Sequence, residues 1–227
     1  MRIAALTDLH GKKIENNTID IILKYNPDIL VVCGDITHFG NDLSVINQLE
    51  QLNKNNEKLS ILAIPGNCDN KEAIDKLTNS NLNIDNKIIN INNINIIGLG
   101  GSNKTPFNTP NEYSEEELYN KFTNIVNENN LNKEQLINNF ILICHVPPIN
   151  TMADLVNNNH FGSSAIRKII EQYKPALTIC GHIHESRTID KIFDSYIVNP
   201  SQKCFVICDV IKKDNKIDVK AIELFDL

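Results

Sequence analysis

The sequence lacks any run of 18 apolar residues, so it offers no segment long enough to form a membrane-spanning helix. The apolar stretch at the N-terminus, residues 1–7, is too short for the hydrophobic region of a secretory signal and leads straight into a polar loop. We therefore expect a cytoplasmic protein that has no membrane partner.

Cysteine is not arranged as in the common cysteine frameworks. The 6 cysteines form no Cys-x-x-Cys pair of the kind that holds structural zinc, and their spacing is not that of a small disulfide-bonded scaffold. Several lie within or at the ends of apolar runs, as small buried side chains do, namely Cys33, Cys144, Cys180 and Cys208. We expect reduced thiols, in agreement with a cytoplasmic location.

A surplus of basic charge is also lacking. The formal net charge is −6 and no stripe of Lys and Arg is present. This disfavours a nucleic-acid polymer as partner, because that binding depends on clustered cations. A small phosphodiester substrate stays compatible with the charge, since bound metal ions can reverse the local field of an acidic protein.

Linker-like stretches and internal repeats are absent as well. With 41% hydrophobic and 22% charged residues the chain has an ordinary globular balance, and its length suits one α/β domain over residues 1–227. Asparagine is used heavily, in runs such as residues 157–159 and 92–93. We interpret this bias as a property of surfaces and turns, without functional content.

Short β-branched apolar runs alternate with longer segments of helical spacing. The runs predict buried strands at Ile3–Thr7, Ile29–Cys33, Leu59–Ile64, Ile94–Leu99, Phe140–Cys144 and Leu177–Cys180. Helices are expected at Asn17–Tyr25, Leu43–Asn53, Lys71–Asn79 and Ser163–Tyr173, with a further one beginning at Ser114. After residue 186 the pattern predicts an antiparallel meander of strands at Arg187–Phe193, Tyr196–Asn199, Lys203–Lys212 and Lys216–Phe225. Two packed mixed sheets with helices outside would accommodate both halves.

Polar residues follow directly after five of these strands. They lie in the segments Asp8-Leu9-His10, Gly34-Asp35, Gly66-Asn67-Cys68-Asp69, His145-Val146-Pro147-Pro148 and Gly181-His182-Ile183-His184. Ligands of open α/β sheets bind beyond the carboxyl ends of the strands. The five loops are therefore expected to converge on one place.

The residue types in these loops indicate a metal site. Asp8 and His10 are two residues apart, so on an extended segment both side chains point to one side. His182 and His184 repeat that spacing, and Asp35 has two carboxylate oxygens, enough to bridge two ions. Oxygen and imidazole ligands without a thiolate suit Mn²⁺, Fe or Zn²⁺. The alternative is structural, since a lone histidine at a strand end is more often a hydrogen-bonded residue than a ligand. All five segments in this order favour the metal site.

The five segments together resemble the signature blocks of the calcineurin-like metallophosphoesterases, across residues 8–184. The resemblance implies a four-layer α/β/β/α sandwich, in which two mixed β-sheets are flanked by helices, and a site for two divalent metal ions. It implies that Asp8, His10, Asp35 and His184 hold one ion, and that Asp35, Asn67, His145 and His182 hold the second. Mn²⁺ is the expected metal, with Fe, Zn²⁺, Ni²⁺ or Mg²⁺ as alternatives. Residues 99–103 and 160–163 further resemble small prokaryotic members of this superfamily.

Cys68 departs from the pattern of many family members, which carry histidine at this position to contact the phosphate and protonate the leaving oxygen. A thiol is a weaker proton donor, because its free pKa is about 8.5 and it lacks the imidazolium charge. Small phosphodiesterases that resemble this chain also use Gly-Asn-Cys-Asp, so the substitution does not predict inactivity. His160 and, less so, His38 are candidates for the acid, with a structural role as the alternative for each.

The function expected from these features is hydrolysis of small phosphodiesters, or else of phosphomonoesters. Two cations would share a water, lower its pKa and present hydroxide to phosphorus. We assign catalysis to Asp35, Asn67, His145 and His160, and substrate contact to Asn67, Cys68 and His160. A Cys-x5-Arg phosphate loop is lacking, which argues against a cysteine nucleophile. The competing hypothesis is a non-catalytic binding scaffold, and a homo-oligomer is compatible with either.

Two further features leave alternatives open. The loop Gly100–Tyr113 is long enough to cover the site, so it is either a specificity lid or an ordinary surface loop. Arg167 lies in a predicted helix after His160 and could reach a phosphate, although a solvated arginine is the commoner outcome.

Overall fold

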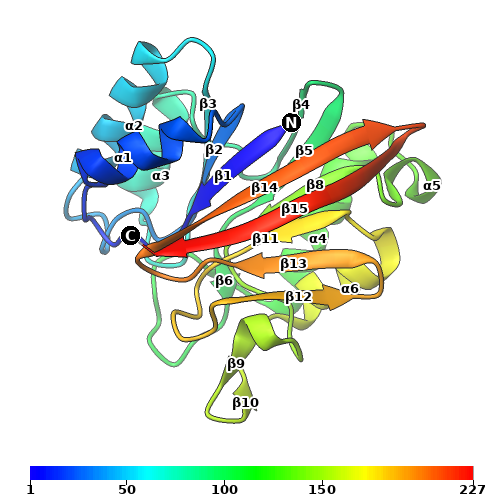
Figure 1. The fold of residues 1–227 in the computed structure, drawn as a ribbon. Helices are drawn as coiled ribbons and strands as arrows, with labels where there is room; N and C mark the ends of the chain where they lie inside the picture. The colour runs from blue at the N-terminus through cyan, green and yellow to red at the C-terminus, as the bar shows by residue number, and fades with distance from the viewer. Residues whose placement is uncertain (227) are drawn as a thin grey trace.

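The computed structural model describes residues 1–226, which are built around two large β-sheets (Figure 1). The first sheet contains, in order, β15 (Lys216–Asp226), β14 (Cys204–Lys213), β1 (Arg2–Leu6), β2 (Ile29–Cys33) and β3 (Ser60–Ile64). The second contains β12 (Thr188–Ile192), β13 (Ser195–Asn199), β11 (Leu177–Ile179), β8 (Phe140–Cys144), β5 (Ile94–Leu99) and β4 (Lys87–Ile91). Two short ribbons pair β6 (Ser102–Asn103) with β7 (Glu112–Tyr113) and β9 (Leu155–Val156) with β10 (Asn159–His160).

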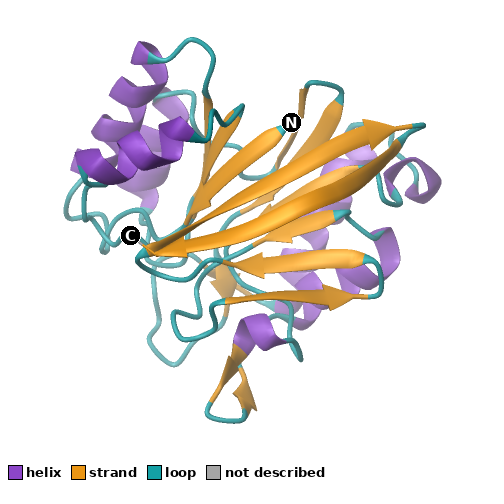
Figure 2. Ribbon diagram, in the orientation of Figure 1, coloured by secondary structure: helices purple, strands orange, loops and turns teal. Residues whose placement is uncertain are grey.

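Helices cover the outer faces of both sheets (Figures 1 and 2). The first sheet packs against α1 (Asn16–Lys24), α2 (Ser44–Asn55) and α3 (Lys71–Asn79). The second packs against α4 (Glu115–Glu128), α5 (Lys133–Leu136) and α6 (Ser164–Tyr173). The predicted four-layer α/β/β/α sandwich is thereby confirmed. Within residues 1–226, none of the helices combines the length and the apolar character that crossing a membrane requires.

The core is divided into three apolar layers by the alternation of side chains along the strands. Ile3 and Ala5 of β1 face the second sheet, where Ile141 of β8 belongs to the same buried cluster. Ala4 and Leu6, on the opposite face of β1, pack among the residues of the helical layer. Because successive strand residues point to opposite faces, one continuous apolar run supplies both layers.

Parallel pairing gathers the functional loops at one end of the molecule. In the first sheet β1, β2 and β3 run parallel, and in the second β5, β8, β11 and β13 do so. Parallel strands need crossover connections, which α1, α2, α4 with α5, and α6 provide. The carboxyl ends of β1, β2 and β3 therefore lie at one edge, as do those of β8 and β11 in the other sheet.

The strand prediction omitted β4 from the first part of the chain and was wrong for the connectivity of the end. The six predicted strands before residue 186 are confirmed with small shifts at their ends, and Ser163 caps α6 as expected. The predicted antiparallel meander is not formed. β12 pairs with β13 and β14 pairs with β15, but β13 also pairs with β11, whereas β14 crosses to β1 in the other sheet. The turn at Asp214-Asn215, with positive φ at both residues, specifies a hairpin locally, but no local signal selects the sheet that a hairpin joins.

Candidate metal centre

The polar loops predicted from the sequence meet between the two sheets. The first sheet contributes Asp8 and His10 after β1, Asp35 after β2 and Asn67 after β3, and the second contributes His145 after β8 and His182 and His184 after β11. Ligand atoms of Asp8, His10 and His184 lie within 4.8 Å of one another, as do those of Asp8, Asp35 and His145. Convergence of the five loops is thus observed.

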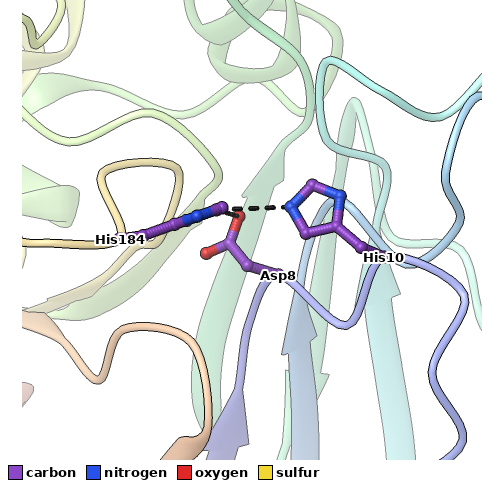
Figure 3. A group of neighbouring side chains, drawn as sticks. All are labelled: Asp8, His10 and His184. Atoms are coloured by element: carbon purple, nitrogen blue, oxygen red, sulfur yellow. Dashed lines mark hydrogen bonds and ion pairs between the residues drawn. The ribbon is translucent and has the colours of Figure 1, made fainter.

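One group of side chains is formed by Asp8, His10 and His184 (Figure 3). The Nε2 atoms of His10 and His184 are 3.2 Å apart, and Asp8 Oδ1 lies 3.3 Å from His184 Nε2. Asp35 Oδ2 approaches His10 Nε2 at 3.7 Å. Two nitrogens and two carboxylate oxygens therefore face a common point.

A second group lies on the other side of Asp35. His145 Nε2 is 2.9 Å from Asn67 Oδ1 and 3.4 Å from Asp35 Oδ1. The ring of His182 crosses that of His145 edge-on, with centroids 5.0 Å apart. The two oxygens of Asp35 thus face different groups, Oδ2 toward His10 and Oδ1 toward His145.

The backbone conformation of the loops that carry the predicted ligands differs from the expectation. Asp8 and His10 were expected on an extended segment, but both have positive φ, 56° and 46°. Asp35 and His182 are also in the left-handed region, at 48° and 68°. This conformation is uncommon for residues other than glycine, costs about 1–3 kcal/mol each and concentrates at functional sites. The side chains of Asp8 and His10 converge through this turn rather than through the period of a strand.

The donor set fits divalent cations. Asp8 Oδ1 and His182 Nδ1 are buried and have no hydrogen-bond partner among the described residues, an arrangement that costs free energy unless something else satisfies them. His145 donates from Nδ1 to the carbonyl oxygen of Cys33 at 2.8 Å, which leaves its Nε2 lone pair directed at Asn67 Oδ1. Fixing the second ring nitrogen on a carbonyl is typical of metal-binding histidine. Facing lone pairs of this kind need a proton or a cation between them.

Electrostatic interactions favour the ligand forms of these groups. Burial opposes ionisation of Asp35, but the charge and hydrogen bond of His145, together with the backbone N–H of Cys68, keep the Asp35 pKa well below its ordinary value. Burial alone would lower the pKa of His145, but the neighbouring carboxylate of Asp35 outweighs burial and raises this pKa to about 9. Burial, reinforced by His145, lowers the pKa of His182 to about 4. At neutral pH Asp35 is a carboxylate and His182 a neutral imidazole, whereas His145 must release a proton to bind a cation.

Comparison with known proteins supports the family resemblance of the five polar segments. A family model described as calcineurin-like phosphoesterase matches residues 1–186. The chain belongs to this family. The uncharacterized protein MJ1162 of Methanocaldococcus jannaschii is 48% identical over 219 residues, 93% of each chain.

Solved structures share the fold. TT1561 of Thermus thermophilus superimposes with a TM-score of 0.68 at 14% identity, over 96% of this chain and 97% of that one. The calcineurin-like phosphoesterase YfkN from Bacillus subtilis gives 0.57 at 12% identity, over 100% of this chain and 90% of its own. The family is one of metal-dependent phosphoesterases, and the clustered carboxylates and imidazoles of this member form groups able to bind a metal ion.

In this calcineurin-like phosphoesterase, Asp8 is held by neighbours that its motif does not include. Thr7 Oγ1 donates to Asp8 Oδ2 at 2.7 Å, and the backbone N–H of His182 donates to the same oxygen at 3.0 Å. These bonds leave Oδ1 free to face His184. A Cβ on Gly181 would lie 1.8 Å from Thr7 Oγ1, so only glycine allows the two loops to approach this closely.

Asp69, the last residue of its block, is fully buried and contacts two of the loops that carry predicted ligands. Its Oδ1 accepts from the backbone N–H and hydroxyl of Thr37, and its Oδ2 accepts from the N–H groups of Ile36 and Gly66. Burial and the charge of Asp35 raise the Asp69 pKa to about 6, against the effect of these hydrogen bonds. Asp69 therefore joins the loop after β2 to the loop after β3.

Cys68 is 8% exposed beside Asp35 and Asn67, and its Sγ accepts from Asn67 Nδ2 at 3.6 Å. Burial, and then the charge of Asp35, raise the pKa of the thiol well above its ordinary value. The thiol is accordingly protonated and poorly nucleophilic at neutral pH. This agrees with the absence of a Cys-x5-Arg loop from the sequence.

The remaining histidines occupy different surroundings. The exposed ring of His38 stands edge-on to His10, with centroids 5.8 Å apart. His160 lies on β10, where its Nδ1 is 2.7 Å from Oδ1 of the fully buried Asp154. Within residues 1–226 no hydrogen bond or ion pair joins His160 to the seven predicted ligands. Arg167 contacts Glu171 and the carbonyls of Ile149 and Asn150, so it holds a loop rather than extending freely into solvent.

The loop Gly100–Tyr113 lies against the loop that carries Asn67. Asn111 donates from its backbone N–H to the carbonyl of Asn67 and from Nδ2 to that of Gly66. Thr109 Oγ1 accepts from Asn67 Nδ2 at 3.0 Å. Sequence reasoning did not identify Thr7 or Thr109, because each acts through another side chain and belongs to no ligand-type motif.

Proposed function

We propose that this calcineurin-like phosphoesterase is a dinuclear metal-dependent phosphodiesterase acting on small soluble substrates. The observation that supports it best is the position of Asp35, whose two oxygens face two separate groups of nitrogen and oxygen donors, at 3.7 Å to His10 and 3.4 Å to His145. In this proposal one ion is held by Asp8, His10, Asp35 and His184, and the second by Asp35, Asn67, His145 and His182. Mn²⁺ is the proposed metal.

The protein's own residues have distinct roles in the proposed reaction. Two bound cations would supply an activated water and neutralise charge on the phosphoryl oxygens. Asp35 would keep them adjacent by giving one oxygen to each. Asn67 and His145 would direct an amide oxygen and an imidazole nitrogen to the second ion, and Asn67 with Cys68 would line the position of the phosphate. The net charge of −6 and the lack of a stripe of Lys and Arg in the sequence favour small esters over nucleic-acid polymers.

Metal content and turnover together test this function. Protein incubated with Mn²⁺ and desalted is expected to retain two ions per chain by elemental analysis and to hydrolyse bis(p-nitrophenyl) phosphate faster than p-nitrophenyl phosphate. Chelator-treated protein is the control and should be inactive until Mn²⁺ is restored. A chain that stays metal-free and inert would instead be a non-catalytic binding scaffold. Cyclic nucleotides and nucleotide diesters, assayed in parallel, would then narrow the substrate class.

We further propose His38, in place of the His160 expected from the sequence, as the group that protonates the leaving oxygen. The exposed ring of His38 adjoins His10, whereas within residues 1–226 the side-chain contact of His160 is to Asp154 and not to a predicted ligand. His38→Ala is expected to lower turnover of a diester with an alkoxide leaving group by about 10²-fold, the lower range for general acid catalysis. Turnover of bis(p-nitrophenyl) phosphate should change little, since p-nitrophenolate departs without a proton. His160→Ala is the matched variant: if it shows this leaving-group dependence and His38→Ala does not, His160 is the acid.

A further inference from the structure

The orientation of the Asn67 carboxamide decides whether the proposed second metal position receives an oxygen or an amino group. Oδ1 points to His145 Nε2 at 2.9 Å, and Nδ2 points the opposite way. A half-turn of the side-chain amide would exchange the two atoms and present N–H groups, which cannot bind a cation. Some neighbour must therefore fix the amide.

Two groups accept from Asn67 Nδ2. Cys68 Sγ, a weak acceptor, lies at 3.6 Å, and Thr109 Oγ1, a stronger acceptor, lies at 3.0 Å. A hydroxyl could in principle donate or accept here, but the Thr109 hydroxyl donates to Glu112 Oε1 at 2.6 Å. With its hydrogen engaged, Oγ1 has only lone pairs to offer Asn67 and accepts from the amino group alone. The flipped amide would place two acceptors, Oδ1 and Oγ1, against each other.

Glu112 fixes the hydroxyl because it can only accept. Its carboxylate also receives the backbone N–H of Thr109 at 2.8 Å and both the N–H and the hydroxyl of Thr105. Burial opposes ionisation of Glu112, but the hydrogen bonds from Thr105 and Thr109 outweigh it and lower the pKa to about 2. The Glu112 carboxylate is therefore charged at neutral pH and has no proton to give to Thr109.

The loop is held in place independently of this contact. The backbone N–H of Asn111 donates to the carbonyl of Asn67 at 3.0 Å, and Asn111 Nδ2 donates to the carbonyl of Gly66 at 2.9 Å. Asn111 thus positions the loop backbone against the ligand loop, so that removing one hydroxyl need not detach it. The Thr109 contact has a separate effect, because it favours the amide orientation in which Asn67 Oδ1 faces His145.

We propose that Thr109 is a positioning residue of the metal centre. Because its hydroxyl donates to Glu112, it can only accept from Asn67, and so it holds the Asn67 oxygen toward the second metal position. The inference rests on the proposed dinuclear function. It also gives the loop Gly100–Tyr113 a role beyond a lid or an ordinary surface loop, because the loop carries a group that sets the orientation of a proposed ligand.

Calorimetric titration with Mn²⁺ tests the role of Thr109 by resolving the two ions. Thr109→Val keeps the shape but removes the acceptor, and it is expected to weaken the second ion about 10- to 100-fold, the usual effect of losing a group that orients a ligand. The first ion should bind as in the wild type. Thr109→Ser restores the hydroxyl and should restore the affinity. Thr105→Val is the matched control, because Thr105 contacts the same Glu112 carboxylate but not Asn67, and it should leave both ions unchanged.

The outcomes separate the inference from the function on which it depends. If the wild type binds two ions and Thr109→Val binds both equally well, or if Thr105→Val weakens the second ion as much, Thr109 does not act through Asn67. A wild type that binds fewer than two ions contradicts the dinuclear function itself. Should Thr109→Val fail to fold, Thr109→Ala removes the same hydroxyl without adding a methyl group, and the same criteria apply to it.

Discussion

Asp35→Asn is expected to lower turnover of bis(p-nitrophenyl) phosphate by about 10²–10³-fold, the range observed when one preorganised charge-stabilising group is removed from an active site. Asp35 is the one residue that the proposal shares between both ions, and its two oxygens lie 3.7 Å from His10 and 3.4 Å from His145. Asparagine offers one oxygen in place of two and no charge. The amino group of the asparagine must face either His10 or His145. The metal position on that side then loses a ligand, and both metal positions lose the bridging charge.

Metal content distinguishes this explanation from a folding defect. We expect Asp35→Asn to retain fewer than two Mn²⁺ ions per chain after desalting, while its circular dichroism spectrum stays that of the wild type. Asp20→Asn, an identical change on the exposed face of α1, serves as the control and should alter neither quantity. Full activity with two ions retained by Asp35→Asn would mean that the dinuclear site is misassigned.

The convergence of the five polar loops could be predicted because each of them follows a strand that is recognisable by itself. The run Ile29–Cys33 is apolar throughout and buried at every position, so the polar Asp35 two residues later is conspicuous. The same holds for Phe140–Cys144 and the His145 that follows. Parallel strands bring such residues to one edge of a sheet whatever their separation in sequence. The strand pattern therefore predicted two packed mixed sheets with helices outside and the place where the loops converge, and the family resemblance implied the four-layer sandwich.

Contacts between distant loops could not be predicted in this way. Asn67 and Thr109 are 42 residues apart, and neither the threonine nor the glutamate that fixes its hydroxyl belongs to a metal-ligand pattern. The left-handed backbone of Asp8 and His10 was missed for a related reason. Aspartate and histidine tolerate positive φ but do not signal it as glycine does, so the extended spacing was the default expectation.

The frequent use of asparagine in this sequence has a structural explanation. More than half of the non-glycine residues with positive φ are asparagines, among them Asn92-Asn93 between β4 and β5 and Asn157-Asn158 between β9 and β10. The chain contains only 9 glycines. Asparagine enters the left-handed region more readily than other residues with a side chain, because its short amide can bond to the local backbone. The interpretation of the asparagine runs as turn residues is confirmed at these two hairpins.

Asp69→Asn is expected to destabilise the protein by about 3–5 kcal/mol although Asp69 is not a proposed ligand, a magnitude typical of breaking a buried, charge-assisted network. Both carboxylate oxygens are occupied, Oδ1 by the N–H and hydroxyl of Thr37 and Oδ2 by the N–H groups of Ile36 and Gly66. Asparagine must turn its amino group toward one of these pairs. If the amino group faces Ile36 and Gly66, two buried N–H groups meet another donor. If it faces Thr37, the hydroxyl can rotate to accept, but the N–H of Thr37 loses its acceptor.

Urea unfolding in the presence of a chelator measures this effect apart from metal binding. Asp75→Asn, the same change at an exposed position of α3, is the matched control and should shift the free energy of unfolding by no more than about 0.5 kcal/mol. Since Asp69 joins the loops that carry Asp35 and Asn67, the Asp69 variant should also bind the second Mn²⁺ more weakly in native conditions. If Asp69→Asn unfolded at the same urea concentration as Asp75→Asn, the four hydrogen bonds would contribute little, and the ligand loops would be held by the packing of β2 and β3 alone.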